Sequence, residues 1–252
     1  MKQAPSKSRG RLLLVPTPLA EVTQTPLSQI LPQASIAAAA ALQHWVVENA
    51  KTARAFLGAV NAVHALGIPL QQHGMAVLPK HAKLDAAAAR VLLQPALDGL
   101  DMGLMSEAGA PCVADPGALL VAAAHDLGIE VVPLVGPSSL LLGLMASGLD
   151  GQRFAFHGYL PVDAEARKQH IQGLERESAQ RHQTQLFIET PYRNTALLLA
   201  LMKTLQPATR LTVASQLTAP DACVRTRSVA QWREDNSQVL DKVPTLFGFL
   251  AS

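Results

Sequence analysis

The sequence predicts an α/β fold in two lobes, and three observations favour it. The chain has 252 residues, 49% of them apolar and 4% aromatic, which allows either one large core or two small ones. Short β-rich apolar runs alternate with longer helical segments, an order typical of a parallel sheet. The composition then changes at residue 163, where a charged segment begins. We therefore expect a flexible N-terminus at 1–10, a domain at 11–157, a linker at 158–162 and a second domain at 163–252.

Prolines and periodicity define the elements of the first domain. Pro16 and Pro18 stop the apolar run 11–15, so this strand should end in a rigid turn. Residues 70–80 mix Gln, His, Gly and Pro without periodicity and are expected to form a loop. Gly148 follows a helical segment and can terminate it. The other expected elements are helices at 34–42, 50–60, 84–97, 116–127 and 137–147 and strands at 44–47, 102–105, 130–133 and 153–157.

The second domain should combine a charged helix with a sheet. The helix expected at 163–181 carries charges of both signs, which is typical of a solvated face. After it, the pattern predicts a helix at 191–205 and strands at 184–188, 211–215, 222–227 and 245–250.

Composition excludes several classes of protein. The formal charge of +2 lacks the strong basic bias of a general nucleic-acid coating protein, although a local basic patch remains open. The two cysteines, Cys112 and Cys223, stand outside any CxxC pattern, and the eight histidines are scattered, so we expect no metal site. No apolar run has a signal core or the roughly 20 residues of a membrane span, so we expect a soluble, cytoplasmic protein.

The segment 106–117 lies between an expected buried strand and a helix. In open α/β sheets, ligands bind beyond the carboxyl ends of strands, where small residues let backbone amides approach closely. Here the loop reads Ser-Glu-Ala-Gly-Ala-Pro-Cys-Val-Ala-Asp-Pro-Gly. Asp115 followed by Pro116 is also a good helix start, so we expect Asp115 to be a cap rather than a catalytic group.

A second loop, residues 135–139, presents two hydroxyls at the start of the next helix. Ser138 and Ser139 could cap that helix or contact a ligand. The spacing is not the GxSxG elbow of serine hydrolases, and GxGxxG, GxxxxGK[ST] and HExxH are also missing. We expect His157 to be a hydrogen-bonded structural residue and Cys112 a small buried one rather than a nucleophile. These patterns alone indicate an α/β ligand-binding enzyme.

Several motifs occur in an order that resembles the tetrapyrrole-methylase superfamily, over residues 12–250. The branch most similar to this chain contains the small-subunit ribosomal RNA 2′-O-methyltransferases. The segments that carry the resemblance are Val-Pro-Thr-Pro at 15–18, the loop 106–117, Pro-Leu-Val-Gly-Pro-Ser-Ser at 133–139, Ala-Ser-Gly-Leu at 146–149, Gly-Tyr-Leu-Pro at 158–161 and Phe-Ile-Glu-Thr-Pro-Tyr-Arg at 187–193.

This resemblance implies a two-domain fold in which each lobe is a sheet flanked by helices. It further implies S-adenosylmethionine bound in a cleft between the lobes without a glycine fingerprint, and a homodimer. The residues that it assigns to cofactor binding are Pro16, Ala108, Gly109, Ala110, Val113, Ser138, Ser139, Glu189, Thr190, Pro244 and Thr245.

Two segments depart from the pattern of the ribosomal RNA enzymes. Those enzymes typically carry Ser-Asp-Ala-Gly-Thr-Pro. In this chain Glu107 stands in place of the Asp and Ala110 in place of the Thr. Their Glu-Asp-Thr-Arg segment appears here as Glu48-Asn49-Ala50-Lys51. Lysine cannot make the planar bidentate phosphate contact of arginine, so the sequence looks like a divergent sub-branch.

The resemblance predicts that the protein transfers a methyl group to RNA, at a ribose 2′-hydroxyl. The RNA would be ribosomal RNA, either free or within a ribosomal subunit. An attacking hydroxyl must lose its proton, and a carboxylate is the natural acceptor, with Glu48, Glu107 and Glu189 as candidates. Arg54, Tyr192 and Arg193 suit phosphate contact and base stacking. Two alternatives stay open: methylation of a small molecule, and a non-catalytic S-adenosylmethionine-binding regulatory paralogue. The sequence does not identify the general base.

Overall fold

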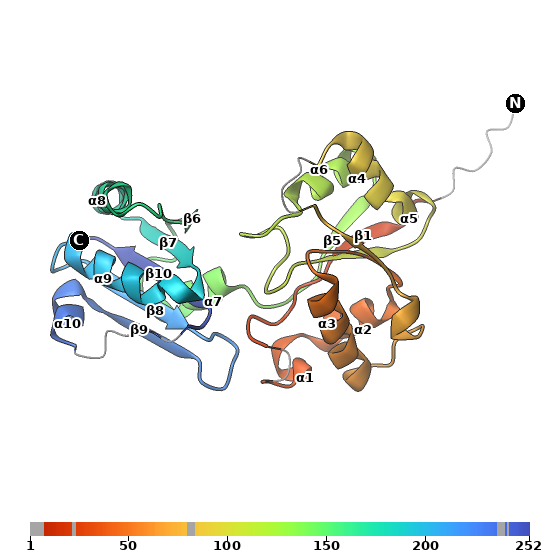
Figure 1. Ribbon diagram of the computed structural model, residues 1–252, viewed down its shortest axis with the longest axis horizontal. Coiled ribbons are helices and arrows are strands. Elements are labelled where there is room, and N and C mark those ends of the chain that lie inside the picture. Colours follow the sequence, from red (N-terminus) through yellow and green to blue (C-terminus); the bar gives the residue numbers. More distant parts are fainter. Residues whose placement is uncertain (1–7, 22–23, 80–83, 236–239, 241) are drawn as a thin grey trace, which may run out of the picture. The chain divides into compact units, whose positions relative to one another are not determined.

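The protein is described from a computed structural model (Figure 1), which covers residues 8–21, 24–79, 84–235, 240 and 242–252. The chain divides into two compact units, Met1–Pro137 and Ser138–Ser252, each with its own sheet. Most of the expected flexible N-terminus lies outside the described residues. Its last residue, Gly10, is buried and donates a backbone hydrogen bond to Ala96 O at 2.8 Å.

The first unit contains a parallel five-stranded sheet of order β3-β2-β4-β1-β5. The expected parallel sheet is confirmed, with three strands predicted to the residue. Since parallel neighbours cannot be joined by a hairpin, the chain must cross over through helices between them. The strands are β1 Arg11–Leu14, β2 His44–Val47, β3 Gly74–Val77, β4 Met102–Met105 and β5 Glu130–Pro133.

Helices cover both faces of this sheet (Figure 1). Val47 and Leu13 belong to the core under one group of helices, whereas their neighbours Val46 and Leu12 belong to the core under the other. This alternation follows from the period of two along a strand. One face carries α1 Leu27–Ile30, α2 Gln33–Ala41 and α3 Ala50–Val63, and the other carries α4 Ala86–Leu92, α5 Gln94–Leu97 and α6 Ala118–Asp126.

Two expectations for this unit were wrong. The segment 70–80 is not simply a loop, because it contains the short helix η1 Leu70–Gln72 and the strand β3, which pairs with β2. Its residues Gly-Met-Ala-Val have weak strand propensity, and pairing at the edge of the sheet decides their conformation. The helix expected at 84–97 is split at Leu93, because Pro95 cannot donate the backbone hydrogen bond that would continue α4.

The second unit contains a mixed sheet of order β6-β7-β10-β8-β9. Strands β6 and β7 are parallel, and the other neighbours are antiparallel. Phe187, Phe247 and Phe249 fill the core on one face. The strands are β6 Phe154–Tyr159, β7 Thr184–Glu189, β8 Arg210–Ser215, β9 Cys223–Ser228 and β10 Thr245–Leu250.

Helices of very different length pack over the phenylalanine face. They are α8 Ala164–Arg181, α9 Asn194–Thr204, which follows η2 Pro191–Arg193, and α10 Val229–Glu234. The opposite face is covered by α7 Ser139–Ser147, which ends at Gly148 in the left-handed conformation, as expected. Among the described residues, no helix combines the length and apolarity needed to cross a membrane.

The division between the units differs from the expected one. The sequence suggested a linker at 158–162, but α7 and β6 already belong to the second unit. Leu140 and Leu144 of α7 pack against Leu246 of β10, and β6 pairs with β7. The change of composition at residue 163 marks the solvent-exposed face of α8 and not a boundary in the chain.

Candidate active site

A short backbone bridge organises the carboxyl end of the first sheet. The Thr17 amide donates to Gly109 O at 3.0 Å, and the Gly109 amide donates to Thr17 O at 3.1 Å. Gly109 has a φ of +75°, which glycine adopts without strain, and a β-carbon there would lie 3.0 Å from Leu19 Cδ2. The bridge pins the loop 106–117 beside the residues that follow β1, next to Pro16.

The side chains of this loop are small and in part exposed. Ala108 is exposed, Ala110 is half-buried and Val113 is 45% exposed. Small exposed side chains leave the backbone open to close approach by a ligand. The structure therefore brings the expected cofactor contacts Pro16, Ala108, Gly109 and Ala110 together, with Val113 on the same loop.

The two segments that depart from the family pattern are in direct contact. Asn49 Nδ2 donates to Glu107 Oε1 at 2.6 Å, and Glu48 Oε2 accepts a hydrogen bond from the Glu107 amide at 3.1 Å. Asn49 Oδ1 accepts from the Lys51 amide at 2.9 Å and so caps α3. Asn49 thus uses both halves of its amide, one for the helix and one for the carboxylate.

Asp115 does not cap α6, so that expectation was wrong. Gly117 is the N-cap of the helix, and its φ of +133° prevents the Asp-Pro pair from continuing into the first turn. The Asp115 carboxyl lies instead near Glu48, Ser106 and Glu107. Burial, and after it the charge of Glu48, raise the pKa of Asp115 to about 6, while the Ser106 hydroxyl acts in the opposite direction and Glu107 adds to the rise.

Cys112 lies on the same loop and is half-buried. Burial, reinforced by the charge of Asp115, raises the pKa of its thiol above the ordinary value. The thiol therefore stays protonated at neutral pH, which fits the expectation that Cys112 is not a nucleophile, although the residue is half-buried and not buried as expected.

In the second unit, two candidate residues bind each other. Glu189 ends β7 and is only 5% exposed. Its Oε2 forms an ion pair with Arg193 Nη2, and its Oε1 accepts from the Thr190 amide at 2.7 Å. The catalytic candidate Glu189 and the RNA-binding candidate Arg193 are therefore engaged within the protein.

The other residues expected to contact the cofactor in this unit lie near Glu189 or at the start of α7. Thr245 is opposite Glu189 in the sheet register and receives a hydrogen bond from Asn194 Nδ2 at 3.0 Å. Thr190 and Pro244 are exposed beside them. Ser138 and Ser139 are half-buried at the start of α7, and the Ser138 side chain forms no cap hydrogen bond with that helix.

Of the residues expected to contact RNA, Arg54 and Tyr192 are exposed. Arg54 lies on α3, where its guanidinium contacts only Ala50 O, at 3.5 Å, among the hydrogen bonds of the described residues. Tyr192 is 80% exposed, and Lys242 Nζ lies 5.3 Å from the centre of its ring. His157 Nε2 lies 2.6 Å from Gln185 Oε1, so this side chain is hydrogen-bonded as expected.

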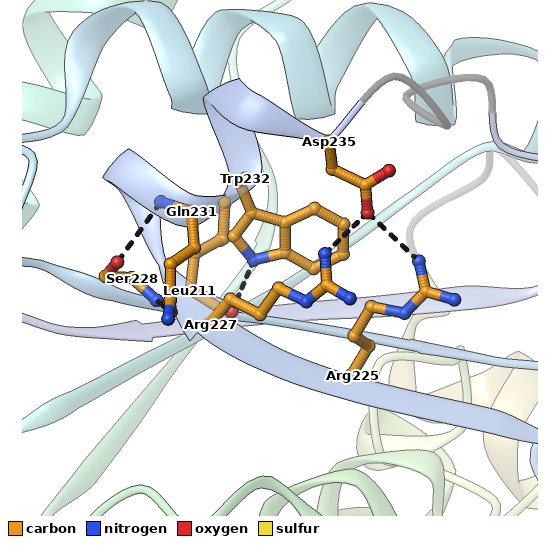
Figure 2. Close-up of polar contacts among 7 residues, drawn as sticks. All are labelled: Leu211, Arg225, Arg227, Ser228, Gln231, Trp232 and Asp235. Carbon is orange, nitrogen blue, oxygen red and sulfur yellow. Dashed lines mark hydrogen bonds and ion pairs between the residues drawn. The ribbon is translucent and has the colours of Figure 1, made fainter.

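A basic cluster on β9 was not singled out in the sequence (Figure 2). Arg227 and Arg225 reach Asp235 Oδ2 at 2.6 and 3.4 Å, and both guanidiniums lie within 6 Å of the Trp232 ring centre, at 5.7 and 5.9 Å. Trp232 Nε1 donates to Leu211 O at 2.8 Å, which fixes the ring. The only signal was the spacing of the two arginines, which puts them on the same face of a strand.

Among the described residues, no three His, Cys, Asp or Glu side chains are arranged to hold a metal ion.

The chain is similar in sequence to curated ribosomal RNA methyltransferases. It is 31% identical over 196 residues to the ribosomal RNA small subunit methyltransferase I of Escherichia coli O157:H7, a match covering 76% of this chain and 59% of that protein. It is 40% identical over 120 residues to the protein of the same name from Synechocystis sp., covering 48% of this chain and 42% of the relative. The chain thus spans less than two thirds of these relatives, and no protein-family model matches it.

Solved structures share the fold over nearly the whole chain. The methyltransferase CobJ aligns with a TM-score of 0.59 at 16% identity, covering 96% of this chain and 100% of that one. A uroporphyrin-III C-methyltransferase from Thermus thermophilus aligns with a TM-score of 0.56 at 15% identity, covering 96% and 97%. The two-domain fold of tetrapyrrole methylases is confirmed, as is the resemblance to ribosomal RNA methyltransferases.

Proposed function

We propose that the protein is an S-adenosylmethionine-dependent methyltransferase that modifies a ribose hydroxyl of small-subunit ribosomal RNA. The observation that carries this proposal is the 31% identity over 196 residues to a protein named for that substrate. Ribosomal RNA as the substrate would place the activity in the cytoplasm. The homodimer implied by the family resemblance stays a prediction.

The first unit fits the chemistry of the proposed cofactor. When bound, S-adenosylmethionine supplies a methyl group on a positively charged sulfur. The loop 106–117 offers small side chains and an accessible backbone, and the carboxylates of Glu48, Glu107 and Asp115 lie at the same end of the sheet. Anionic groups in a partly buried setting favour a cationic ligand. Pro16, Ala108, Gly109, Ala110 and Val113 are the residues that we assign to binding in this unit.

The assignments in the second unit remain predictions. The predicted cofactor contacts there are Ser138, Ser139, Glu189, Thr190, Pro244 and Thr245. The predicted RNA contacts are Tyr192 and Arg193 of this unit and Arg54 of the first unit.

The contact between Asn49 and Glu107 argues against a decayed, non-catalytic site. A carboxylate at position 49, as in the family pattern, would face the Glu107 carboxylate across a hydrogen-bonding distance. The amide turns that repulsion into the 2.6 Å hydrogen bond. Since the family pattern has an acid at both places, only Asn49 changes the charge, and the hydrogen bond that it makes keeps the two altered segments joined in an ordered contact. On this ground we favour an enzyme over a regulatory paralogue.

The test combines cofactor binding with methyl transfer. Purified protein is titrated calorimetrically with S-adenosylmethionine, and labelled methyl incorporation is measured into small ribosomal subunits that lack the modification. Ala108→Arg puts a bulky cation on the exposed loop and should abolish binding, because it fills the approach and repels the sulfonium. The matched control is Ala122→Arg. Ala122 is also an exposed alanine but lies on α6, away from the loop, so this variant should bind S-adenosylmethionine normally.

Binding without incorporation into RNA, together with turnover on a small acceptor, would move the assignment to a small-molecule methyltransferase. Absence of binding by the wild type would contradict the proposal altogether.

A further inference from the structure

A cavity in the second unit lies beside the two arginines of β9. Its volume is about 370 Å³, within the range of about 300–1,000 Å³ that is typical of small-ligand sites. The walls come from the end of β8, the start of β10, β9 and α10, so the whole cavity belongs to the second unit. The lining residues include Ser215, Gln216, Cys223, Arg225, Trp232 and Thr245.

The arginines beside this cavity are held in place from two sides. Figure 2 shows the guanidiniums of Arg225 and Arg227 directed toward the same oxygen, Asp235 Oδ2. Their central carbons also lie 5.9 and 5.7 Å from the centre of the Trp232 ring, where an indole attracts a cation. Side chains that are already fixed lose little conformational entropy when a ligand binds, which favours tight binding.

The arginine pair carries more positive charge than Asp235 neutralises. Among the described residues, Asp235 Oδ2 is the one hydrogen-bond acceptor of both guanidiniums. The Arg225 and Arg227 side chains keep 42% and 39% of their surface exposed, and each guanidinium has several N–H donors in a planar fork. Such a fork binds two oxygens of a phosphate through parallel hydrogen bonds, so the exposed side of the pair suits a phosphate.

The rest of the lining combines apolar surface with a hydrogen-bond acceptor. Val213, Leu240 and Trp232 contribute apolar atoms. Asp221 also lines the cavity and accepts a hydrogen bond from Gln216 Nε2 at 2.7 Å, and a carboxylate can accept further bonds. A flat ring with N–H groups at its edge, such as a nucleobase, matches these walls better than a phosphate alone.

We propose that this cavity binds one unpaired nucleotide of the substrate RNA, with a backbone phosphate on Arg225 and Arg227 and the base inside. The inference rests on the proposed function, since it takes RNA to be the substrate. It adds a binding site that the motifs of the sequence had not indicated. The phosphate contact positions the strand, and the cavity selects a base that is not stacked in a duplex.

The first experiment measures binding of a fluorescently labelled single-stranded RNA oligonucleotide by anisotropy at several salt concentrations. The wild type is compared with Arg225→Gln combined with Arg227→Gln. We expect the double variant to bind roughly tenfold to hundredfold more weakly, and the slope of log K against log salt to fall by about 1, because fewer counterions are released. The matched control is Arg176→Gln, at an exposed arginine on α8 of the same unit, which should bind as the wild type does.

Arg227→Lys separates the geometry of the contact from its charge. The positive charge beside Asp235 stays, so the salt slope should equal that of the wild type. The affinity for RNA should fall several-fold, because an ammonium group cannot make the planar two-bond contact. Urea unfolding of each variant in a Trp45→Phe background, in which Trp232 is the remaining tryptophan, checks that the second unit is folded.

Cys223→Phe tests the cavity separately from the arginines. Cys223 is exposed and lines the cavity, so phenylalanine fills part of it without a change of charge. We expect RNA affinity to fall roughly tenfold, as for the loss of one base contact, with the salt slope unchanged. Cys223→Ser leaves the cavity open and should bind RNA normally. S-adenosylmethionine affinity should be the same in all of these variants.

The outcomes separate this inference from the proposed function. If the wild type methylates RNA, and the double glutamine variant or Cys223→Phe binds RNA as tightly as the wild type, the nucleotide site is wrong and the methyltransferase proposal stands. Loss of S-adenosylmethionine binding in Cys223→Phe, with RNA binding kept, would assign the cavity to the cofactor. Displacement of the RNA by polyglutamate at equal charge would show a general anion-binding surface and overturn the inference. Failure of the wild type to bind or methylate RNA would overturn the proposed function and the inference with it.

Discussion

Glu189 ends strand β7 of the second sheet and Asp115 lies on the loop after β4 of the first, yet their surroundings are opposite. Glu189 is paired with Arg193 and hydrogen-bonded by Thr190. Asp115 faces Glu48 and Glu107, and burial raises its pKa to about 6. From the sequence, Glu189 was a catalytic candidate and Asp115 an expected helix cap, and neither interpretation anticipated these surroundings. The comparison shows that a carboxylate's chemistry is set by its neighbours: one carboxylate stabilises its unit, and the other is held at a cost to stability.

The largest expected effect is at Glu189. Replacing Glu189 by Ala leaves the partly buried Arg193 guanidinium without its anion and removes the acceptor of the Thr190 amide. Because the Arg193 side chain keeps 32% of its surface exposed, we expect a loss of about 3 kcal/mol in unfolding free energy, at the low end for a buried pair. Glu189→Gln, which keeps the hydrogen-bond acceptor, should lose less.

Urea denaturation followed by tryptophan fluorescence measures this effect in the right unit. The chain has two tryptophans, both buried, with Trp45 in the first unit and Trp232 in the second. A Trp45→Phe background therefore reports unfolding of the second unit alone. A change below 1 kcal/mol would mean that the Glu189–Arg193 pair contributes little net stability.

Replacing Asp115 should raise the unfolding free energy, whereas replacing Glu189 should lower it. The pKa of Asp115 in the folded protein is raised from 3.8 to about 6, so the folded state holds the proton more tightly than the unfolded chain. Stability is then lost as the pH rises from about 4 to 6 and stays lost above it. Asp115→Asn removes this cost, and after allowance for its partial exposure we expect the variant to be about 1–2 kcal/mol more stable than the wild type at pH 7.5.

The measurement compares the two proteins in a Trp232→Phe background, so that Trp45 reports the first unit. The difference between them should shrink toward zero at pH 4, where the wild-type carboxyl is protonated. A difference that is independent of pH would show that the gain comes from packing and not from the charge.

Regular elements with a buried periodic pattern were predicted well from the sequence. The strands 44–47, 102–105, 130–133 and 245–250 match the structure residue for residue, because continuous apolar runs bounded by turn residues leave few alternatives. Strand β3 was missed, since its Gly-Met-Ala-Val sequence becomes a strand only through pairing with β2.

The site was less predictable, because its geometry depends on contacts between distant segments. The family resemblance identified the correct loops, but Asp115 was assigned to a cap. The course of the backbone around Asp115 depends on positive φ angles at Cys112, Ala114 and Gly117. Only the glycine among these could be recognised in the sequence as a residue that favours such angles. The Asn49–Glu107 hydrogen bond joins the ends of two strands, and the sequence alone showed two separate departures from a pattern.

The smallest predicted effect tests whether those two departures depend on each other. Asn49→Asp should still cap α3 through its side-chain oxygen, but it places a carboxylate against Glu107 in place of a hydrogen-bond donor. Because both side chains are partly exposed, we expect a loss of only about 0.5–1 kcal/mol at pH 7.5 relative to Asn49→Ser, which also caps but carries no charge. The loss should decrease as the pH falls and one carboxyl takes up a proton.

In Asn49→Asp combined with Glu107→Gln, an amide again faces a carboxylate, and stability should return. If the double variant were no more stable than Asn49→Asp alone, the two positions would be independent, and the intact-site argument drawn from their contact would lose its support.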